Sequence, residues 1–300
     1  MNRTSKSYKL MKICAIDIGS NSVRLMMWAD GKTLYKKMTT TRLGEGLDKS
    51  GVLLSGAMER TAEAVAAFVA EGREEKAERI YAFGTAAVRS ASNSAQFTAL
   101  VNEKCGVEVD VVSGEREAFL GLSGALKGAD GGIIDVGGAS TEVTVRQGGE
   151  IVFSHSFGIG TVRIFDGVGR DLGKMKKFID DRLTLLGGKS FPSVSFCAIG
   201  GTASRLGAIK NNLTEYKSSV IDGTQLSLSE VEGYAEMLTS MPVEEIARTT
   251  ICGKSAEVVG GGAALLAAVM AKLAISRVTV SESDNLEGYV AQALGAEAES

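Results

Sequence analysis

The chain has 300 residues, a formal net charge of −3 and 44% hydrophobic residues, which fits two domains of ordinary size with sizeable cores. No basic run is long enough to bind nucleic acid by bulk electrostatics, and no segment is long and apolar enough to span a membrane. The four cysteines have no C-x-x-C spacing, which favours reduced structural thiols in a cytoplasmic protein.

The first half of the chain is predicted to combine strands with helices. Residues 1–11 are polar and basic, and they predict a flexible extension rather than a secretory signal. Three strands follow at 12–16, 23–29 and 33–37, and a strongly amphipathic helix is predicted at 55–74. A strand at 79–83, a helix at 94–104, a strand at 107–112 and a helix at 115–126 complete the order βββαβαβα. This first domain is expected to span residues 12–127.

The second half, residues 128–300, begins with the same pattern. Three strands are predicted at 132–134, 141–145 and 151–156, then a helix at 172–185 and a strand at 194–198. Helices are predicted at 229–239, 243–251 and 256–273, the last interrupted by three glycines at 260–262, followed by a strand at 277–280 and a helix at 285–294. The repeat indicates two related domains, and the last helix is expected to pack back on the first.

A glycine-rich turn that begins with an aspartate occurs once in each half. The two copies read Asp17-Ile18-Gly19-Ser20-Asn21-Ser22 and Asp135-Val136-Gly137-Gly138-Ala139-Ser140-Thr141-Glu142. Such a turn leaves backbone N–H groups open to phosphate, and the aspartate can hold a metal ion or a water molecule. A single copy is equally typical of an ordinary hairpin turn. Two copies at matching positions indicate two hairpins that close on one phosphorylated ligand.

Three further motifs follow predicted strands. Gly84-Thr85 leads to Arg89, which can bind phosphate through a bidentate contact or simply remain solvated. Glu117 lies in the first turn of a predicted helix, where it can take a proton from water or only complement the positive end of the helix. The run at 200–202 repeats the Gly-Thr pattern in the second half, which strengthens the evidence for a duplication.

Five runs of the sequence, in their order and spacing, resemble the exopolyphosphatase / guanosine pentaphosphate phosphohydrolase (Ppx/GppA) family from about residue 12 to the end of the chain. They are Asp17 to Ser22, Arg42 to Gly46, Gly84 to Arg89, Ser113 to Ala118, and Asp135 to Glu142. The resemblance implies an α/β fold of duplicated actin-like (ribonuclease H-like) βββαβα domains, as in the actin, sugar-kinase and heat-shock-chaperone ATPase superfold. It also implies the short, two-domain form of the family.

The resemblance also implies site residues. Glu117 matches the family's catalytic glutamate, and Asp17, Asp135 and Glu142 match acidic residues near the metal and the attacking water. The residues that match phosphate binders are Gly19, Ser20, Asn21, Ser22, Arg89, Gly137, Gly138, Ala139, Ser140 and Thr141. Mg²⁺ is the implied cofactor. A monovalent cation such as K⁺ and a homodimer are expected on the resemblance alone.

Three positions depart from the family's motifs. Arg116 stands where the family has another glutamate, which puts a cation beside the proposed base. Ala139 replaces a glycine, which narrows the second turn, and Leu286 replaces an arginine.

The residues and the resemblance together predict an exopolyphosphatase that removes the terminal phosphate of inorganic polyphosphate, with Glu117 as general base and Mg²⁺ as cofactor. One alternative is hydrolysis of the 5′ γ-phosphate of guanosine pentaphosphate. Another is a non-catalytic actin-like protein that binds a nucleotide or polyphosphate. No nucleic acid or membrane partner is expected.

Overall fold

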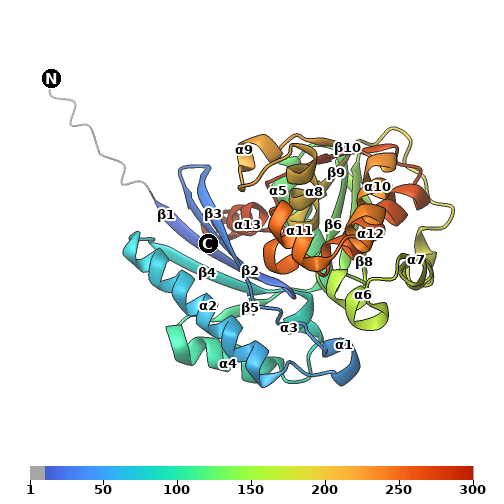
Figure 1. Ribbon diagram of the computed structural model, residues 1–300. Helices are drawn as coiled ribbons and strands as arrows, with labels where there is room; N and C mark the ends of the chain where they lie inside the picture. Colours follow the sequence, from blue (N-terminus) through green and yellow to red (C-terminus); the bar gives the residue numbers. More distant parts are fainter. Residues whose placement is uncertain (1–10, 300) are drawn as a thin grey trace.

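The computed structural model describes residues 11–299, which form two α/β halves (Figure 1). The predicted flexible extension at 1–11 lies outside this range except for residue 11. Within the described range, no helix is long and apolar enough to cross a membrane.

The first half is built on a five-stranded sheet in the order β3-β2-β1-β4-β5. Its strands are β1 (Lys12–Ile18), β2 (Ser22–Ala29), β3 (Lys32–Thr40), β4 (Arg79–Gly84) and β5 (Val109–Val111). Strand β1 pairs antiparallel with β2 and parallel with β4. Helices α2 (Ser55–Glu74) and α4 (Ser94–Cys105) pack together over one face of this sheet, and the short helices α1 (Leu47–Ser50) and α3 (Ala86–Ser90) lie in its connections (Figure 1).

The second sheet repeats this topology and adds one strand. Its order is β10-β11-β9-β6-β7-β8. The strands are β6 (Gly131–Val136), β7 (Thr141–Gln147), β8 (Glu150–Phe157), β9 (Phe196–Ile199), β10 (Gln225–Ser227) and β11 (Arg277–Val280). Strand β6 pairs antiparallel with β7 and parallel with β9, as β1 does with β2 and β4. The predicted duplicated, ribonuclease H-like fold is therefore confirmed.

Most helices of the second half share one large hydrophobic core with this sheet. They are α6 (Thr161–Val168), α7 (Leu172–Asp180), α8 (Gly200–Lys210), α9 (Ser218–Ile221), α10 (Leu228–Ser240), α11 (Val243–Thr249) and α12 (Val259–Lys272), with 3₁₀ turns η1 (Thr184–Leu186) and η2 (Gly253–Ser255). The predicted break at 260–262 is wrong, because these glycines lie inside α12. They permit close packing: a Cβ at Gly262 would lie 2.8 Å from the Thr202 hydroxyl oxygen, and one at Gly260 would lie 2.9 Å from Thr239.

Two helices exchange partners between the halves. Helix α5 (Gly114–Leu126) follows the first sheet in sequence but packs on the second, where Leu122 joins a cluster with Ile133 and Ile199. Helix α13 (Asn285–Glu299) follows the second sheet but packs on the first. Since α5 belongs to one half in sequence and to the other in packing, the boundary near residue 127 stays a prediction.

The two exchanged helices also contact each other, and glycines set their closest approach. A Cβ at Gly288 of α13 would lie 1.9 Å from the Leu120 carbonyl oxygen of α5. A Cβ at Gly124 of α5 would lie 2.0 Å from the Asp284 carbonyl oxygen. The backbones therefore touch at this crossing, which joins the two sheets and fixes the start of α13 beside both.

Candidate functional site

The two glycine-rich turns face each other where β1 and β6 end. In each turn the N–H of the first glycine donates to a carbonyl three residues later, from Gly19 to Ser22 at 3.1 Å and from Gly137 to Ser140 at 3.0 Å. The turns touch, because a Cβ at Gly138 would lie only 2.7 Å from Cβ of Ser20. Close approach, rather than a left-handed backbone, is what requires glycine at 138.

A cavity of about 100 Å³ lies between the two turns. Most predicted site residues line it: Asp17, Gly19, Ser20, Asn21, Ser22, Glu117, Asp135, Gly137, Gly138, Ala139 and Ser140. The first residues of α8, at 200–202, line it as well. The lining therefore combines backbone N–H groups, the positive end of a helix and buried carboxylates, which is a suitable environment for a phosphate and a cation.

Glu117 enters the cavity from the first turn of α5, where the side chain of Ser113 caps the helix. Its Oε2 accepts a hydrogen bond of 2.9 Å from Nη1 of Arg89, which also donates to the Val112 carbonyl at 2.8 Å. Burial and then the charge of Glu142 raise the pKa of Glu117 well above its usual range, while Arg89 opposes the shift. A raised pKa makes the ionised carboxylate a stronger base.

Three predicted site residues lie just behind the cavity rather than along it. Arg89 holds Glu117, Thr141 donates to the Ile159 carbonyl at 2.8 Å, and Glu142 accepts from the Ser156 hydroxyl at 2.6 Å. The guanidinium of Arg89 is thus positioned to orient the carboxylate of Glu117.

The departures at 116 and 286 also lie away from the cavity. Arg116 donates to Asp110 at 2.7 Å and to Gln292 at 2.9 Å, so the expectation that it sits beside Glu117 is wrong. Successive helix residues point in different directions, which turns Arg116 toward α13. Leu286 is fully buried in the core between α13 and the first sheet. Ala139 does line the cavity.

The three predicted metal ligands are buried carboxylates. Burial raises the pKa of Asp135 to about 8, with Arg24 opposing, and burial together with the charge of Asp135 raises the pKa of Glu142 to about 7. Burial also raises the pKa of Asp17 against the effect of Arg24. A bound cation stabilises the ionised form of such carboxylates, whose pKa values are raised.

These carboxylates fit a cation that shares its coordination with the substrate. Oδ1 of Asp17 and Oε2 of Glu142 are buried and have no hydrogen-bond partner among the described residues. Within residues 11–299, no three Asp, Glu, His or Cys side chains form a group that could hold a metal ion by themselves. Mg²⁺ is commonly held by one or two carboxylates together with water and substrate phosphates, so this donor set suits it.

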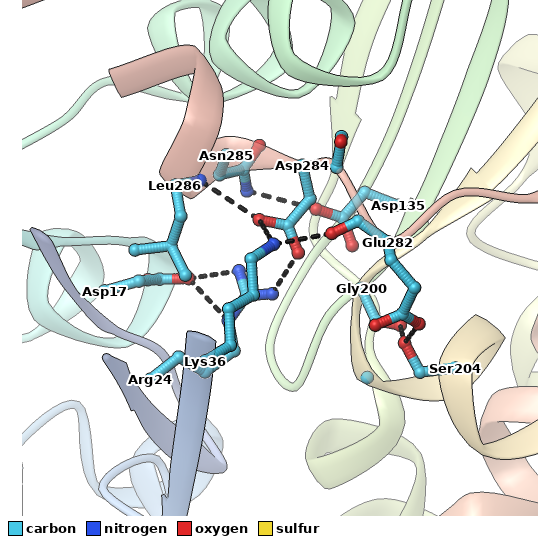
Figure 2. Close-up of polar contacts among 12 residues, drawn as sticks. Asp17, Arg24, Lys36, Asp135, Gly200, Ser204, Glu282, Asp284, Asn285 and Leu286 are labelled. Atoms are coloured by element: carbon cyan, nitrogen blue, oxygen red, sulfur yellow. Dashed lines mark hydrogen bonds and ion pairs between the residues drawn. The ribbon is translucent and has the colours of Figure 1, made fainter. Parts of the chain in front are cut away.

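The sequence did not point to Arg24 of β2, which lines the cavity. Figure 2 shows its contacts with Asp17 and Asp284. Its guanidinium donates to Asp17 and to Asp284, and Asn285 donates to Oδ2 of Asp135 at 3.1 Å. Burial opposes its charge, but the carboxylates of Asp284 and Asp17 hold the pKa of Arg24 well above its usual range. Asp284, just before α13, thus contacts Arg24 of the first half, and Asn285, the first residue of α13, contacts Asp135 of the second half.

Hairpin geometry offered a signal for Arg24. The first turn sets β1 and β2 in a register that places Asp17 directly opposite Arg24, and facing residues on adjacent strands interact. No comparable local signal existed for Asp284 and Asn285, which come from the other end of the chain.

Comparisons with known proteins place this sequence and fold in one phosphatase family. The model of the Ppx/GppA phosphatase family matches residues 12–297. Exopolyphosphatase 2 of Mycobacterium tuberculosis is 26% identical over 95% of this chain and 99% of its own length. The bifunctional 3-dehydroquinate synthase/phosphatase of Fusobacterium nucleatum is 25% identical over 92% of this chain, which spans only 46% of that longer protein. The crystal structure of an exopolyphosphatase from Cytophaga hutchinsonii has a TM-score of 0.82 at 23% identity, over 95% of this chain and 98% of that one, which shows a shared fold.

Proposed function

The chain belongs to the Ppx/GppA phosphatase family, and we propose that it is an exopolyphosphatase that hydrolyses the terminal phosphoanhydride bond of inorganic polyphosphate. The observation that carries this proposal is the meeting of both glycine-rich turns at one cavity into which Glu117 projects. The near full-length similarity to a relative named exopolyphosphatase favours polyphosphate as the substrate.

The proposed reaction is an in-line attack of water on the terminal phosphorus. Backbone N–H groups that follow Gly19 and Gly137 in the two turns, together with the positive end of α8, hold the terminal phosphate. Glu117, oriented by Arg89, takes a proton from the water as its oxygen bonds to phosphorus. The bridging P–O bond breaks, and orthophosphate and a chain shorter by one unit are released. Positioning and electrostatics supply most of the catalysis in such reactions.

Asp135, with Asp17 and Glu142 nearby, would hold a divalent cation such as Mg²⁺ in this site. When bound, the cation screens the charge of the phosphate oxygens. A requirement for K⁺ and a homodimer remain predictions. All four cysteines are free, which supports the predicted cytoplasmic location.

A phosphate-release assay tests the proposal. Purified protein with Mg²⁺ is given long-chain polyphosphate, tripolyphosphate, guanosine pentaphosphate and ATP, each at matched concentrations of cleavable ends. We expect the highest kcat/KM with long-chain polyphosphate. A higher kcat/KM with guanosine pentaphosphate would make that nucleotide, rather than polyphosphate, the substrate. Phosphate release from none of the four would indicate a non-catalytic binding protein.

A further inference from the structure

A second cavity adjoins the first and is larger, at about 440 Å³. It lies between β3, the start of α8 and the segment before α13, and both cavities are lined by Arg24, Met38, Gly201 and Arg205. The two cavities are therefore neighbours that share a wall made of these four residues.

Arg205 stands at the junction with its charge unbalanced. Only 8% of its surface is exposed, and no carboxylate of the described residues lies within ion-pair distance of it. It donates to the Gly201 carbonyl at 2.7 Å and to the Ser255 hydroxyl at 2.9 Å, both neutral groups. Its Nε is buried and has no hydrogen-bond partner among residues 11–299. A buried cation of this kind calls for an anion that the protein does not supply.

The other cations of the second cavity are already paired. Arg24 is held by Asp17 and Asp284, Lys36 contacts Glu287 at 2.8 Å, and Lys37 contacts Glu71 at 2.9 Å. The contacts of Arg24 and Lys36 with Asp284 are drawn in Figure 2. Arg205 is thus the cation of this wall that is left for a ligand.

The acidic side chains of the second cavity are occupied as well. Asp284 is bound by Arg24, and Glu282 accepts from the Ser204 hydroxyl at 2.6 Å and from the Tyr216 hydroxyl. Arg24 and Lys36 balance the charge of Asp284, whereas the two hydroxyl donors orient the Glu282 carboxylate without neutralising it.

We propose that Arg205 binds a second phosphate group of the substrate, and that the larger cavity receives the part of the phosphate chain that is not being cleaved. This inference rests on the proposed function. A guanidinium suits the task, because it always carries its charge and donates through several N–H groups in a fixed plane. The ligand class is an inorganic oligophosphate of at least two linked phosphates, and orthophosphate should bind without using Arg205.

Equilibrium binding tests this inference without relying on turnover. Titration calorimetry with Mg²⁺ present would measure orthophosphate and tripolyphosphate binding to the Glu117→Gln protein, alone and combined with Arg205→Met. We expect Arg205→Met to weaken tripolyphosphate binding by about 10- to 100-fold, as for loss of a charge-assisted contact. Orthophosphate affinity should change by less than about twofold. Arg248→Met, at an exposed position of α11, is the matched control and should change neither affinity.

Arg205→Lys covers the case in which the methionine variant does not fold. It keeps the charge but not the planar donor set, so tripolyphosphate binding should weaken by about 3- to 10-fold with orthophosphate binding unchanged. Unchanged tripolyphosphate affinity in either folded variant, or an equal loss for both anions, would overturn the proposal. A protein that releases no phosphate from polyphosphate yet shows the Arg205-dependent difference would refute the proposed function and leave this inference standing.

Discussion

Glu117 and Asp135 are both buried, both face the cavity, and each has a hydrogen-bond donor from a distant segment. Their raised pKa values follow mainly from burial, and the charge of Arg89 or Arg24 opposes the shift. The sequence motifs pointed to these two carboxylates. They also pointed to Arg89, which was expected to bind phosphate and instead donates to Glu117. They did not point to Arg24, Arg205 or Asn285, because these come from separate segments that meet only after the chain has folded.

Replacing Glu117 with glutamine should lower kcat for polyphosphate by about 10²–10⁴-fold, since the amide cannot accept the proton of the attacking water. Circular dichroism and melting temperature should stay close to those of the wild type, because glutamine keeps the shape and an acceptor for Arg89. In the wild type, the acidic limb of the kcat profile should lie well above the ordinary pKa of a glutamate. Activity within about threefold of wild type would remove Glu117 from the role of base.

Asp135→Asn separates a metal-binding role from a turn-stabilising role. A ligand role predicts a folded protein whose Mg²⁺ midpoint for phosphate release rises by about tenfold or more, because a neutral amide binds Mg²⁺ poorly. A purely structural role predicts a lower melting temperature with an unchanged Mg²⁺ midpoint. Titrating Mg²⁺ and melting the same preparation decides between them.

The same variant tests the pKa of Asp135 in protein freed of metal by a chelator. A carboxyl whose pKa is raised by folding, here to about 8, stabilises the fold fully below its unfolded pKa of about 4 and loses that contribution as pH rises through the folded value. Wild-type stability in urea should therefore fall as the pH rises from about 4 to about 8. Asp135→Asn should show a smaller fall, and an identical fall would contradict the assignment.

The helices and strands differ in how well short-range sequence patterns predict them. Most strands and the hairpins of both sheets were predicted, because alternating apolar residues and glycine turns act over a few residues. The short strand β10 at the edge of the second sheet was not predicted. Helices α6 and α8 were not predicted, since each begins at or directly after a glycine with no side-chain cap. The predicted helix at 172–185 ends at Asp180 and continues only as the 3₁₀ turn η1.

Helix α10 begins with a complete capping box. The N–H of Glu230 donates to the Ser227 hydroxyl, and the Glu230 carboxylate accepts from the Ser227 N–H at 2.8 Å. Hydrogen bonds from Lys210 and then from Ser227 lower the pKa of Glu230 to about 2. A carboxylate with a lowered pKa stabilises the fold above its unfolded pKa and loses that effect as pH falls through the folded value.

Glu230→Gln should therefore destabilise the protein by about 1 kcal/mol or less at pH 7, and the difference should shrink as pH falls from about 4.5 toward 2. Urea midpoints at several pH values measure it. Glu232→Gln, an exposed position on the same helix, is the control and should show little difference at any pH. A Glu230→Gln difference that stays constant with pH would contradict the capping contribution.

The molecule as a whole depends on the crossing of α5 and α13. This crossing brings Asp284 and Asn285 to Arg24 and Asp135, so it connects packing to the site. No periodicity in the sequence revealed it, because Gly124 and Gly288 belong to helices more than a hundred residues apart.

Gly288→Ala should destabilise the protein by about 1–3 kcal/mol or more, because its Cβ would meet the backbone oxygen of Leu120. Activity should fall as well, since the start of α13 would shift away from Arg24 and Asp135. Gly295→Ala is the matched control on the same helix, where an added Cβ meets nothing within 4 Å. That variant should be neutral or more stable, by up to about 1 kcal/mol. Equal melting temperatures for the two variants would show that α5 and α13 can move apart at their crossing without loss of stability.

The exchange of helices also dictates when the protein can finish folding during its synthesis. The face of the first sheet that carries Ile13, Ala15 and Phe83 is covered by Leu286 and Val290 of α13. A ribosome adds roughly 5–20 residues per second, so this apolar face waits roughly 10–30 s after α5 is made before its cover emerges. During that interval the first half exposes an apolar face that a chaperone can bind, and neither half has its full set of packing partners before α13 is made.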